Sequence, residues 1–409
     1  MQRRLKQIAK QSIKAIPGAK NVAKNAKRLY TIYAYGRIQL LYYKLRKTPF
    51  DVLFCHSPRV WPAIKPVVEE LVRRRGDLRL GLVSWSSKES EDSFFFRGNP
   101  KLYNVPTNLL YLFDTRILYS PHHEMLLRTR AKMPPKSRLV AAVMSLNTLD
   151  GTFPVNAFEA YDYILCAGPH HLDSFRQRAL RNPALSGKWL LPAGYPKLGF
   201  LLASHSVKRR PTDPSVGWTV VYAPTHSYFA NERLASVRHY GEDIINALLA
   251  EGYRVIFRPH PISFFDRDGP VIDRICQLHA DDPNFSLDKS MDYAESYSLA
   301  DIMITDFSGT GFTFSFSFVR PTIFFSPNAG AERQRRELQF DASHRIGALV
   351  RDIDELIGKT SELCNRDLTD EIERFRDEAI FNVGKSAAYI VDCLEDILSG
   401  CERPEWVRS

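Results

Sequence analysis

The 409-residue sequence lacks the patterns of secreted disulfide-linked, zinc-binding and membrane-spanning proteins. Its six cysteines show no CxxC or zinc-ligand spacing, which fits a reducing cytosol. No signal peptide is visible, because no uninterrupted apolar segment and small-residue cleavage site follow the basic N-terminus. The most apolar early stretch, residues 29–43, is interrupted by Arg37 and falls short of the roughly 20 residues that a spanning helix needs. We expect a protein that does not cross a membrane.

Residues 1–50 contain no aspartate or glutamate, but they contain thirteen lysines and arginines. Subtracting thirteen from the net charge of +10 leaves −3 for residues 51–409, so the folded body is nearly neutral. Apolar residues recur at near-helical spacing among these basic ones, and tyrosines follow them. This pattern predicts a basic amphipathic helical arm over residues 1–48 that binds an anionic membrane surface. A solvated tail and a nucleic-acid-binding arm are the alternatives, and the charge of the body argues against a nucleic-acid partner.

No repeat of fixed period is evident, and the content of 44% hydrophobic and 25% charged residues excludes a disordered chain. From residue 51, short apolar runs alternate with amphipathic segments, which is typical of βαβ units and parallel sheets. A polar stretch over residues 208–217 reads as a linker. The predicted strands are Val52–Phe54, Leu80–Val83, Leu109–Phe113, Leu139–Val143, Tyr163–Cys166, Trp189–Leu191, Thr219–Tyr222, Val255–Phe257, Ile302–Thr305 and Thr322–Phe325.

This alternation predicts an α/β protein with two doubly wound, Rossmann-like domains that face each other across a cleft. The domains span residues 49–207 and 218–382, and a C-terminal helix and tail over residues 383–409 follow them. Ligands of such sheets bind beyond the carboxyl ends of the strands.

Three of the predicted strands end in polar residues suited to a phosphate. Residues 302–305 run into Asp306, Ser308, Gly309 and Thr310, which precede a helix-like segment, and a helix N-terminus with hydroxyls favours an anion. Tight strand–helix turns use the same residues without any ligand, so this stretch alone is a weak signal.

The other two strand ends carry histidines. Residues 255–257 lead to Arg258 and His260, and the prolines on both sides of His260 fix the backbone around it. Residues 219–222 lead to Thr225 and His226. Together the three strand ends offer the hydroxyls, amides and imidazoles that a nucleotide diphosphate pocket needs.

These stretches also resemble a known family. Tyr222-Ala-Pro-Thr225, Arg258-Pro-His-Pro261 and the segment from Ala300 to Ser308 are similar to signature blocks of the CDP-glycerol glycerophosphotransferases, enzymes of teichoic-acid and capsule polymer synthesis. The resemblance implies a GT-B fold, in which the C-terminal domain binds the nucleotide donor and the N-terminal domain supplies the acceptor and a base. It also implies a peripheral enzyme at the cytoplasmic face of the cell membrane, which agrees with the basic arm.

The sequence departs from the family pattern at its catalytic block. Where the family has Trp-His-Gly-Thr, this chain has Leu149-Asp-Gly-Thr152, so Asp150 replaces the base. Gly309 also stands where the family has a second serine, and Thr313 where it has an aspartate. A carboxylate can serve as a general base, and His56, at another strand end, is the rival candidate. Asp150, His56 and His260 are therefore our candidate catalytic residues.

The predicted reaction is the transfer of glycerol phosphate, or a related polyol phosphate, from a CDP-activated donor to a lipid-linked or polymer acceptor, with release of CMP. The candidate donor-binding residues are Thr225, His226, Arg258, Asp306, Ser308, Gly309 and Thr310. We expect no metal and no cofactor, since no acidic cluster suggests a metal site. A GT-B glycosyltransferase that uses a nucleotide sugar is the main alternative, and a nucleotide-binding scaffold without catalysis is another.

Overall fold

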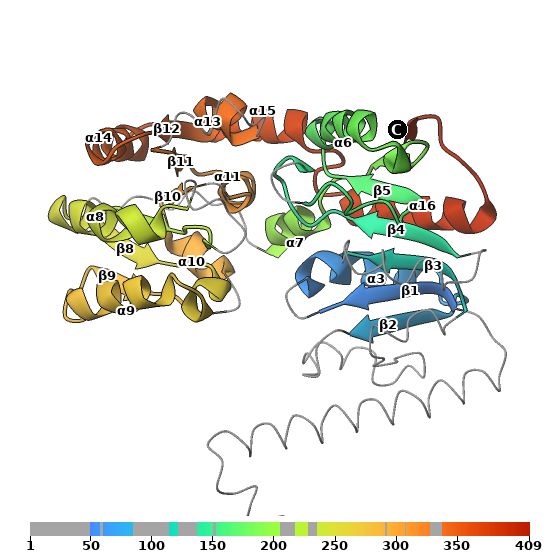
Figure 1. Ribbon diagram of the computed structural model, residues 1–409, viewed down its shortest axis with the longest axis horizontal. Coiled ribbons are helices and arrows are strands. Elements are labelled where there is room, and N and C mark those ends of the chain that lie inside the picture. Colours follow the sequence, from blue (N-terminus) through green and yellow to red (C-terminus); the bar gives the residue numbers. More distant parts are fainter. Residues whose placement is uncertain are drawn as a thin grey trace, which may run out of the picture.

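The computed structural model describes residues 50–57, 60–84, 114–121, 137–149, 153–204, 217–227, 235–290, 293–306, 308–327 and 338–409. The arm predicted over residues 1–48 lies outside these ranges. So do the strand predicted at 109–113 and all of the predicted linker except its last residue, Gly217. The described chain forms two α/β units, each built on its own sheet, which lie side by side in Figure 1.

The N-terminal sheet has seven strands in the order β13-β6-β5-β4-β3-β1-β2. Strands β1 to β6 are parallel, whereas β13 pairs antiparallel with β6. The apolar runs that predicted β1, β2, β4, β5 and β6 are buried, as is usual where helices cover both faces of a parallel sheet. The strands are β1 (Phe50–His56), β2 (Leu80–Ser84), β3 (Thr115–Ser120), β4 (Arg138–Ala142), β5 (Tyr163–Cys166), β6 (Trp189–Pro192) and β13 (Val407–Arg408).

The C-terminal sheet has six parallel strands in the order β12-β11-β10-β7-β8-β9. From β7 the chain builds outward to β9, and it then returns to place β10 on the other side of β7. The direction of winding therefore reverses between β7 and β10. The strands are β7 (Thr219–Tyr222), β8 (Arg254–Phe257), β9 (Phe285–Leu287), β10 (Ile302–Thr305), β11 (Thr322–Phe325) and β12 (Gly347–Val350).

Helices connect and cover these strands, as the alternating pattern predicts. Most are amphipathic; in α9, for example, Ile272 and Ile275 are buried while Asp273 and Arg274 are exposed. Helix α11 differs, because Gly311 to Phe318 are all buried. The helices are α3 (Trp61–Arg74), α6 (Pro169–Arg181), α7 (Pro196–Ser204), α8 (Val237–Ala250), α9 (Gly269–Leu278), α10 (Ala294–Leu299), α11 (Thr310–Phe318), α13 (Leu338–Ile346), α14 (Ile353–Cys364), α15 (Thr369–Ala379) and α16 (Ser386–Ser399), with short 3-10 helices η4 (Pro183–Leu185) and η5 (Pro261–Phe265).

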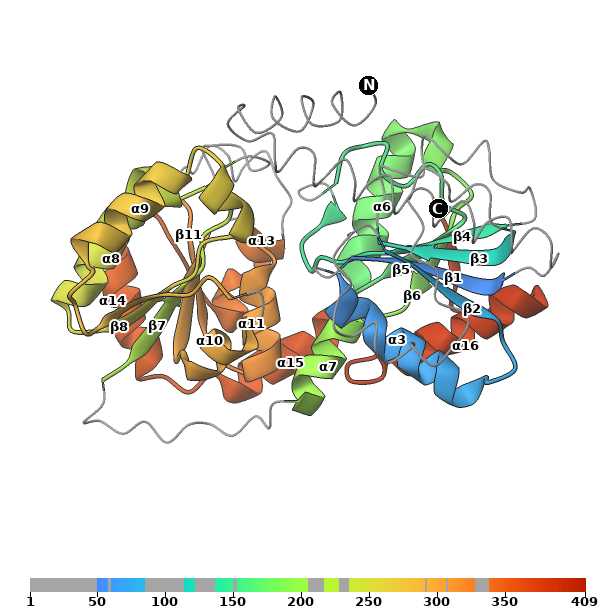
Figure 2. The ribbon, with the colours of Figure 1, turned by 90° about the horizontal axis from the view of Figure 1, so that it is seen from below.

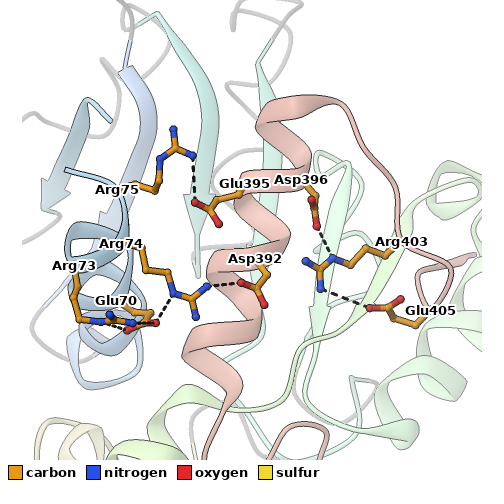
Figure 3. A network of polar contacts seen from close by, with 9 residues as sticks. All are labelled: Glu70, Arg73, Arg74, Arg75, Asp392, Glu395, Asp396, Arg403 and Glu405. Carbon is orange, nitrogen blue, oxygen red and sulfur yellow. Dashed lines mark hydrogen bonds and ion pairs between the residues drawn. The ribbon is translucent and has the colours of Figure 1, made fainter. Parts of the chain in front are cut away.

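The C-terminal end of the chain returns to the N-terminal unit. Helix α15 packs against α11 and α13, and α16 then packs against α3 and α7 (Figure 2). Ile390, Val391 and Leu394 of α16 are buried in one cluster with Trp61 and Ile64 of α3. Around this apolar contact, arginines of α3 and of the segment after it pair with acidic residues of α16, as Figure 3 shows. The tail then adds β13 to the edge of the N-terminal sheet.

Candidate active site

The candidate donor site lies where the winding of the C-terminal sheet reverses. In an open parallel sheet, the loops after the two strands at such a point separate to opposite faces and leave room for a ligand. Thr225 and His226 follow β7, and Asp306 and Ser308 follow β10, which is its hydrogen-bonded neighbour. His260 follows β8, which flanks β7 on the other side. The topology thus brings together three strand ends that the sequence singled out separately.

Asp306 connects the β10 end to the β7 loop. Its carboxylate is buried and accepts hydrogen bonds from the backbone N–H of Thr225 at 2.9 Å and of Ser236 at 2.8 Å. The hydroxyl of Ser236 donates a third bond at 2.8 Å. Burial raises the pKa of Asp306 to about 6, although these hydrogen bonds favour the ionised form. Because it faces the protein interior, Asp306 holds the β7 loop in place rather than presenting its charge to a ligand.

His226 and His260 form a pair. Their ring centroids are 4.4 Å apart, at an interplanar angle of 49°. Nδ1 of His260 accepts a hydrogen bond from the backbone N–H of Ile262 at 3.2 Å. In the neutral imidazole this leaves the proton on Nε2, so the second ring nitrogen is a hydrogen-bond donor. Two imidazoles this close suit a ligand with several anionic oxygens, such as a diphosphate.

Arg258 turns away from this pair and toward the β9 edge. Its guanidinium pairs with Asp288 and donates to the Ser290 carbonyl at 2.9 Å. Burial opposes ionisation of Asp288, but hydrogen bonds from Ser290 and Ser296 and the charge of Arg258 hold its pKa below the ordinary value. Arg258 therefore shapes the loop after β9, and its charge is already compensated by a carboxylate.

The hydroxyls predicted to bind an anion at the N-terminus of α11 make hydrogen bonds within the protein. The backbone N–H of Thr310 donates to Ser308 Oγ at 3.2 Å, and the Thr310 hydroxyl lies 2.5 Å from the Tyr297 hydroxyl. Gly309 lets the other unit approach, since a Cβ at this position would lie 3.3 Å from Asn147 Oδ1. Asn147 belongs to the loop after β4, so residues of both units meet at the helix N-terminus.

The N-terminal unit is the expected acceptor side. His56 ends β1 and is buried, with its ring centroid 5.0 Å from that of Trp61. Asp150 lies outside the described residues, but the chain on both sides of it is firmly held. The buried guanidinium of Arg178 on α6 donates to the carbonyls of Leu149 at 2.5 Å and Pro154 at 2.8 Å, and also to that of Phe153.

Of the adjacent histidines on α6, His171 is fully buried and His170 is partly buried. Nδ1 of His171 accepts from the backbone N–H of Ala167 at 3.0 Å, and Nε2 lies 2.8 Å from the carbonyl of Asn147. Burial lowers the pKa of His170 to about 4 and that of His171 well below the ordinary value. The neutral imidazole of His171 connects the backbone of Ala167 to that of Asn147 and so fixes the loop that carries Asn147.

The sequence missed several residues that build the site. Ser236 lies at the start of α8 and Asn147 in the loop after β4, and neither lies in a motif that marks it. Within the described ranges, no group of three or more His, Cys, Asp or Glu side chains could hold a metal ion. In the same ranges, no helix is long and apolar enough to cross a membrane.

Comparisons with known proteins give a matching family model and similar solved structures. A family model described as CDP-Glycerol:Poly(glycerophosphate) glycerophosphotransferase matches residues 152–396, more than half of the chain. The solved structure of the wall teichoic acid polymerase TagF is similar, with 16% identity, a TM-score of 0.60 and coverage of 86% of this chain and 90% of that chain. A variant of that polymerase after a soak with CDPG has 15% identity, a TM-score of 0.56 and coverage of 94% and 98%.

Another similar structure is the UDP-GlcNAc 2-epimerase of Methanocaldococcus jannaschii in complex with UDP-GlcNAc and UDP. It has 14% identity, a TM-score of 0.59 and coverage of 84% of this chain and 99% of that chain. No curated protein matched the sequence. These likenesses confirm an α/β fold with two parallel sheets of the GT-B type.

Proposed function

The chain belongs to the CDP-glycerol:poly(glycerophosphate) glycerophosphotransferase family, a family of transferases, and we propose that it moves glycerol phosphate, or a related polyol phosphate, from a CDP-activated donor to a membrane-linked cell-surface polymer. One observation carries the proposal. The ends of β7, β8 and β10, where the sequence resembles the family's blocks, meet at the switch point of the C-terminal sheet and pair His226 with His260.

The donor's diphosphate would bind between the histidine pair and the N-terminus of α11. There the Nε2–H of His260, the hydroxyls of Ser308 and Thr310 and the helix dipole all favour negative charge. Residues 218–382 would form the donor domain and residues 49–207 the acceptor domain. The 1–48 arm would hold the enzyme at the cytoplasmic face of the membrane, next to a lipid-linked acceptor.

In the transfer step, a base accepts the proton of an acceptor hydroxyl, whose oxygen attacks the donor's β-phosphorus. The bond from that phosphorus to the bridging oxygen breaks, and CMP leaves with the electron pair. The donor-side imidazoles and hydroxyls stabilise the charge that develops on the phosphates. Asp150 is our preferred base over His56, because His56 is buried against Trp61, whereas a base must reach the acceptor hydroxyl.

The test incubates the full-length protein with source-cell membranes and either CDP-glycerol or UDP-GlcNAc. We expect release of CMP from CDP-glycerol together with incorporation of glycerol into membrane-bound polymer. Release of nucleotide from UDP-GlcNAc alone would reject CDP-glycerol as the donor in favour of the glycosyltransferase alternative. UDP-GlcNAc is used because a protein of similar fold binds it.

Variants connect the activity to the site. His260→Ala should lower the rate of CMP release by about a hundredfold, since it removes a donor from the phosphate pocket. His239→Ala is the matched control, because His239 lies exposed on α8. Equal rates for the two variants would exclude the proposed pocket.

A further inference from the structure

Asp268 is a fully buried carboxylate at the start of α9. An aspartate at a helix N-cap normally accepts a hydrogen bond from the backbone of its own first turn. Asp268 occupies the N-cap position of α9 but makes no such capping bond. Its oxygens are directed to other parts of the C-terminal unit instead.

Two loops supply its hydrogen bonds. The Ser227 hydroxyl donates to Oδ1 at 2.6 Å, and the Ser227 backbone N–H donates to Oδ2 at 3.0 Å. The Ser263 hydroxyl donates to Oδ2, also at 3.0 Å. Ser227 directly follows His226, and Ser263 lies in η5, which begins directly after His260. One buried carboxylate thus connects the two loops that present the histidine pair.

The backbone at His226 is held from both sides. On one side the Thr225 N–H donates to Asp306, and on the other the Ser227 N–H donates to Asp268. His260 is fixed in turn by the Ile262 N–H and by the tie from Ser263 to Asp268. The 4.4 Å separation of the two rings is therefore set by buried groups behind them. A buried carboxylate that accepts several hydrogen bonds is costly to disturb, so it holds this spacing rigidly.

We propose that Asp268 is a positioning residue for diphosphate recognition, which sets the spacing of His226 and His260 without touching the donor itself. The proposal rests on the donor site assigned above. Asp268→Asn would place an amide N–H against the donating Ser227 N–H or Ser263 hydroxyl and so let the loops separate. The imidazoles would then fit the two phosphates less well, while a nucleoside without phosphates would bind as it does to the wild type.

The test measures binding of CDP and of cytidine to the full-length protein by calorimetry. Asp268→Asn should weaken CDP binding about tenfold and leave cytidine binding unchanged, because the loss is confined to the phosphates. Asp273→Asn, which removes an exposed carboxylate from the same helix, is the control and should change neither affinity. Ser263→Ala removes a single tie and should give a smaller loss of the same kind, which keeps the test available if Asp268→Asn does not fold.

A double-mutant cycle separates positioning from general stability. In a His226→Ala/His260→Ala background, Asp268→Asn should no longer weaken CDP binding, since the groups through which it acts are gone. An equal loss of CDP and cytidine affinity, or an unchanged CDP affinity, would overturn the proposal for Asp268 alone. Failure of the unaltered protein to bind CDP would overturn this proposal and the proposed function together.

Discussion

At the scale of single residues, Asp306 shows how burial and function are linked in this site. Its carboxyl group accepts three hydrogen bonds, from Thr225 in the loop after β7 and from Ser236 at the start of α8, and these bonds favour the ionised form. Burial nevertheless raises its pKa to about 6, well above the value of about 4 for aspartate in an unfolded chain. The residue that orders the His226 loop is therefore one whose ionisation weakens the fold.

The sign of the pH effect follows from this shift. Between about pH 6 and pH 4, the folded protein holds a proton on Asp306 that the unfolded chain does not hold. The stability from this group is therefore complete below about pH 4 and is lost as the pH rises through 6. The free energy of unfolding of the wild type, relative to Asp306→Asn, should increase by up to about 1.4 kcal/mol per unit as the pH falls from 6 to 5.

Denaturant titrations at several pH values measure this difference. Asp273→Asn, on the surface of α9, serves as the control and should follow the wild type across the range. Parallel curves for the wild type and Asp306→Asn would show that the carboxyl titrates normally.

At the scale of elements, the sequence predicts the strands of the C-terminal unit well. The bounds of β7, β10 and β11 match their predicted ranges to the residue, because each is a short buried run with clear turn residues around it. Site residues that directly follow such a strand, such as His226 and His260, could be found for the same reason. Ser236 and Asp268 could not, since their bonds to these loops depend on how distant segments close in space.

The N-terminal sheet was harder to predict at β3. Two apolar runs lie close together here, at residues 109–113 and 117–119, and we predicted a strand only over the first, which lies outside the described residues. In the structure β3 spans Thr115–Ser120, where the exposed Arg116 interrupts the apolar run and pairs with Asp51 of β1 at 2.9 Å. With Arg116 in its second position, the segment lacks the uninterrupted apolar run that marks a buried strand, so the sequence did not predict β3.

Helix α6 holds the chain on both sides of the proposed base through Arg178. A lysine carries one point charge with less reach, so it cannot replace a guanidinium that bonds three carbonyls at once. Arg178→Lys should lower the free energy of unfolding by about 2 kcal/mol, because buried carbonyls lose their donors. It should also lower kcat for CMP release, because the segment that contains Asp150 is no longer held.

Chemical denaturation and steady-state assays measure the two effects. Arg181→Lys on the same helix is the matched control, since its side chain is exposed and donates to the Gln177 carbonyl at 3.2 Å. A full kcat in Arg178→Lys at a temperature where it remains folded would show that this clamp does not serve catalysis.

At the scale of the whole molecule, the last thirty residues tie the two units together. The ion pairs around α16 in Figure 3 are partly exposed, and such pairs contribute little stability individually. The apolar side chains of α16 and the buried Trp406 supply most of the attachment. The sequence indicated a helix here but not that it packs on the N-terminal unit. Strand β13 has only two residues, which is too short for the sequence to show that it pairs with β6.

The chain passes so close to the N-terminal unit at the end of α15 that only glycine fits at position 168, which faces it. A Cβ on Gly168 would lie 1.8 Å from the carbonyl oxygen of Ala379, and the next residues continue the contact, with the Phe381 N–H donating to the Ala167 carbonyl at 2.9 Å. The backbone at Gly168 is extended, which any residue can adopt, so a substitution there tests the contact alone.

Gly168→Ala should therefore lower the free energy of unfolding by about 3 kcal/mol, the upper range for an added methyl in packed surroundings. It should also displace the crossing segment, so that amides of α16 exchange hydrogen faster while those of β7 and β10 remain protected. Gly358→Ala within α14 is the control, because a Cβ there meets nothing within 4 Å and should raise stability by about 0.5–1 kcal/mol. Uniformly faster exchange in both sheets of Gly168→Ala would instead mean that the crossing segment is essential to a single cooperative fold, because the two units would then unfold together when it is displaced.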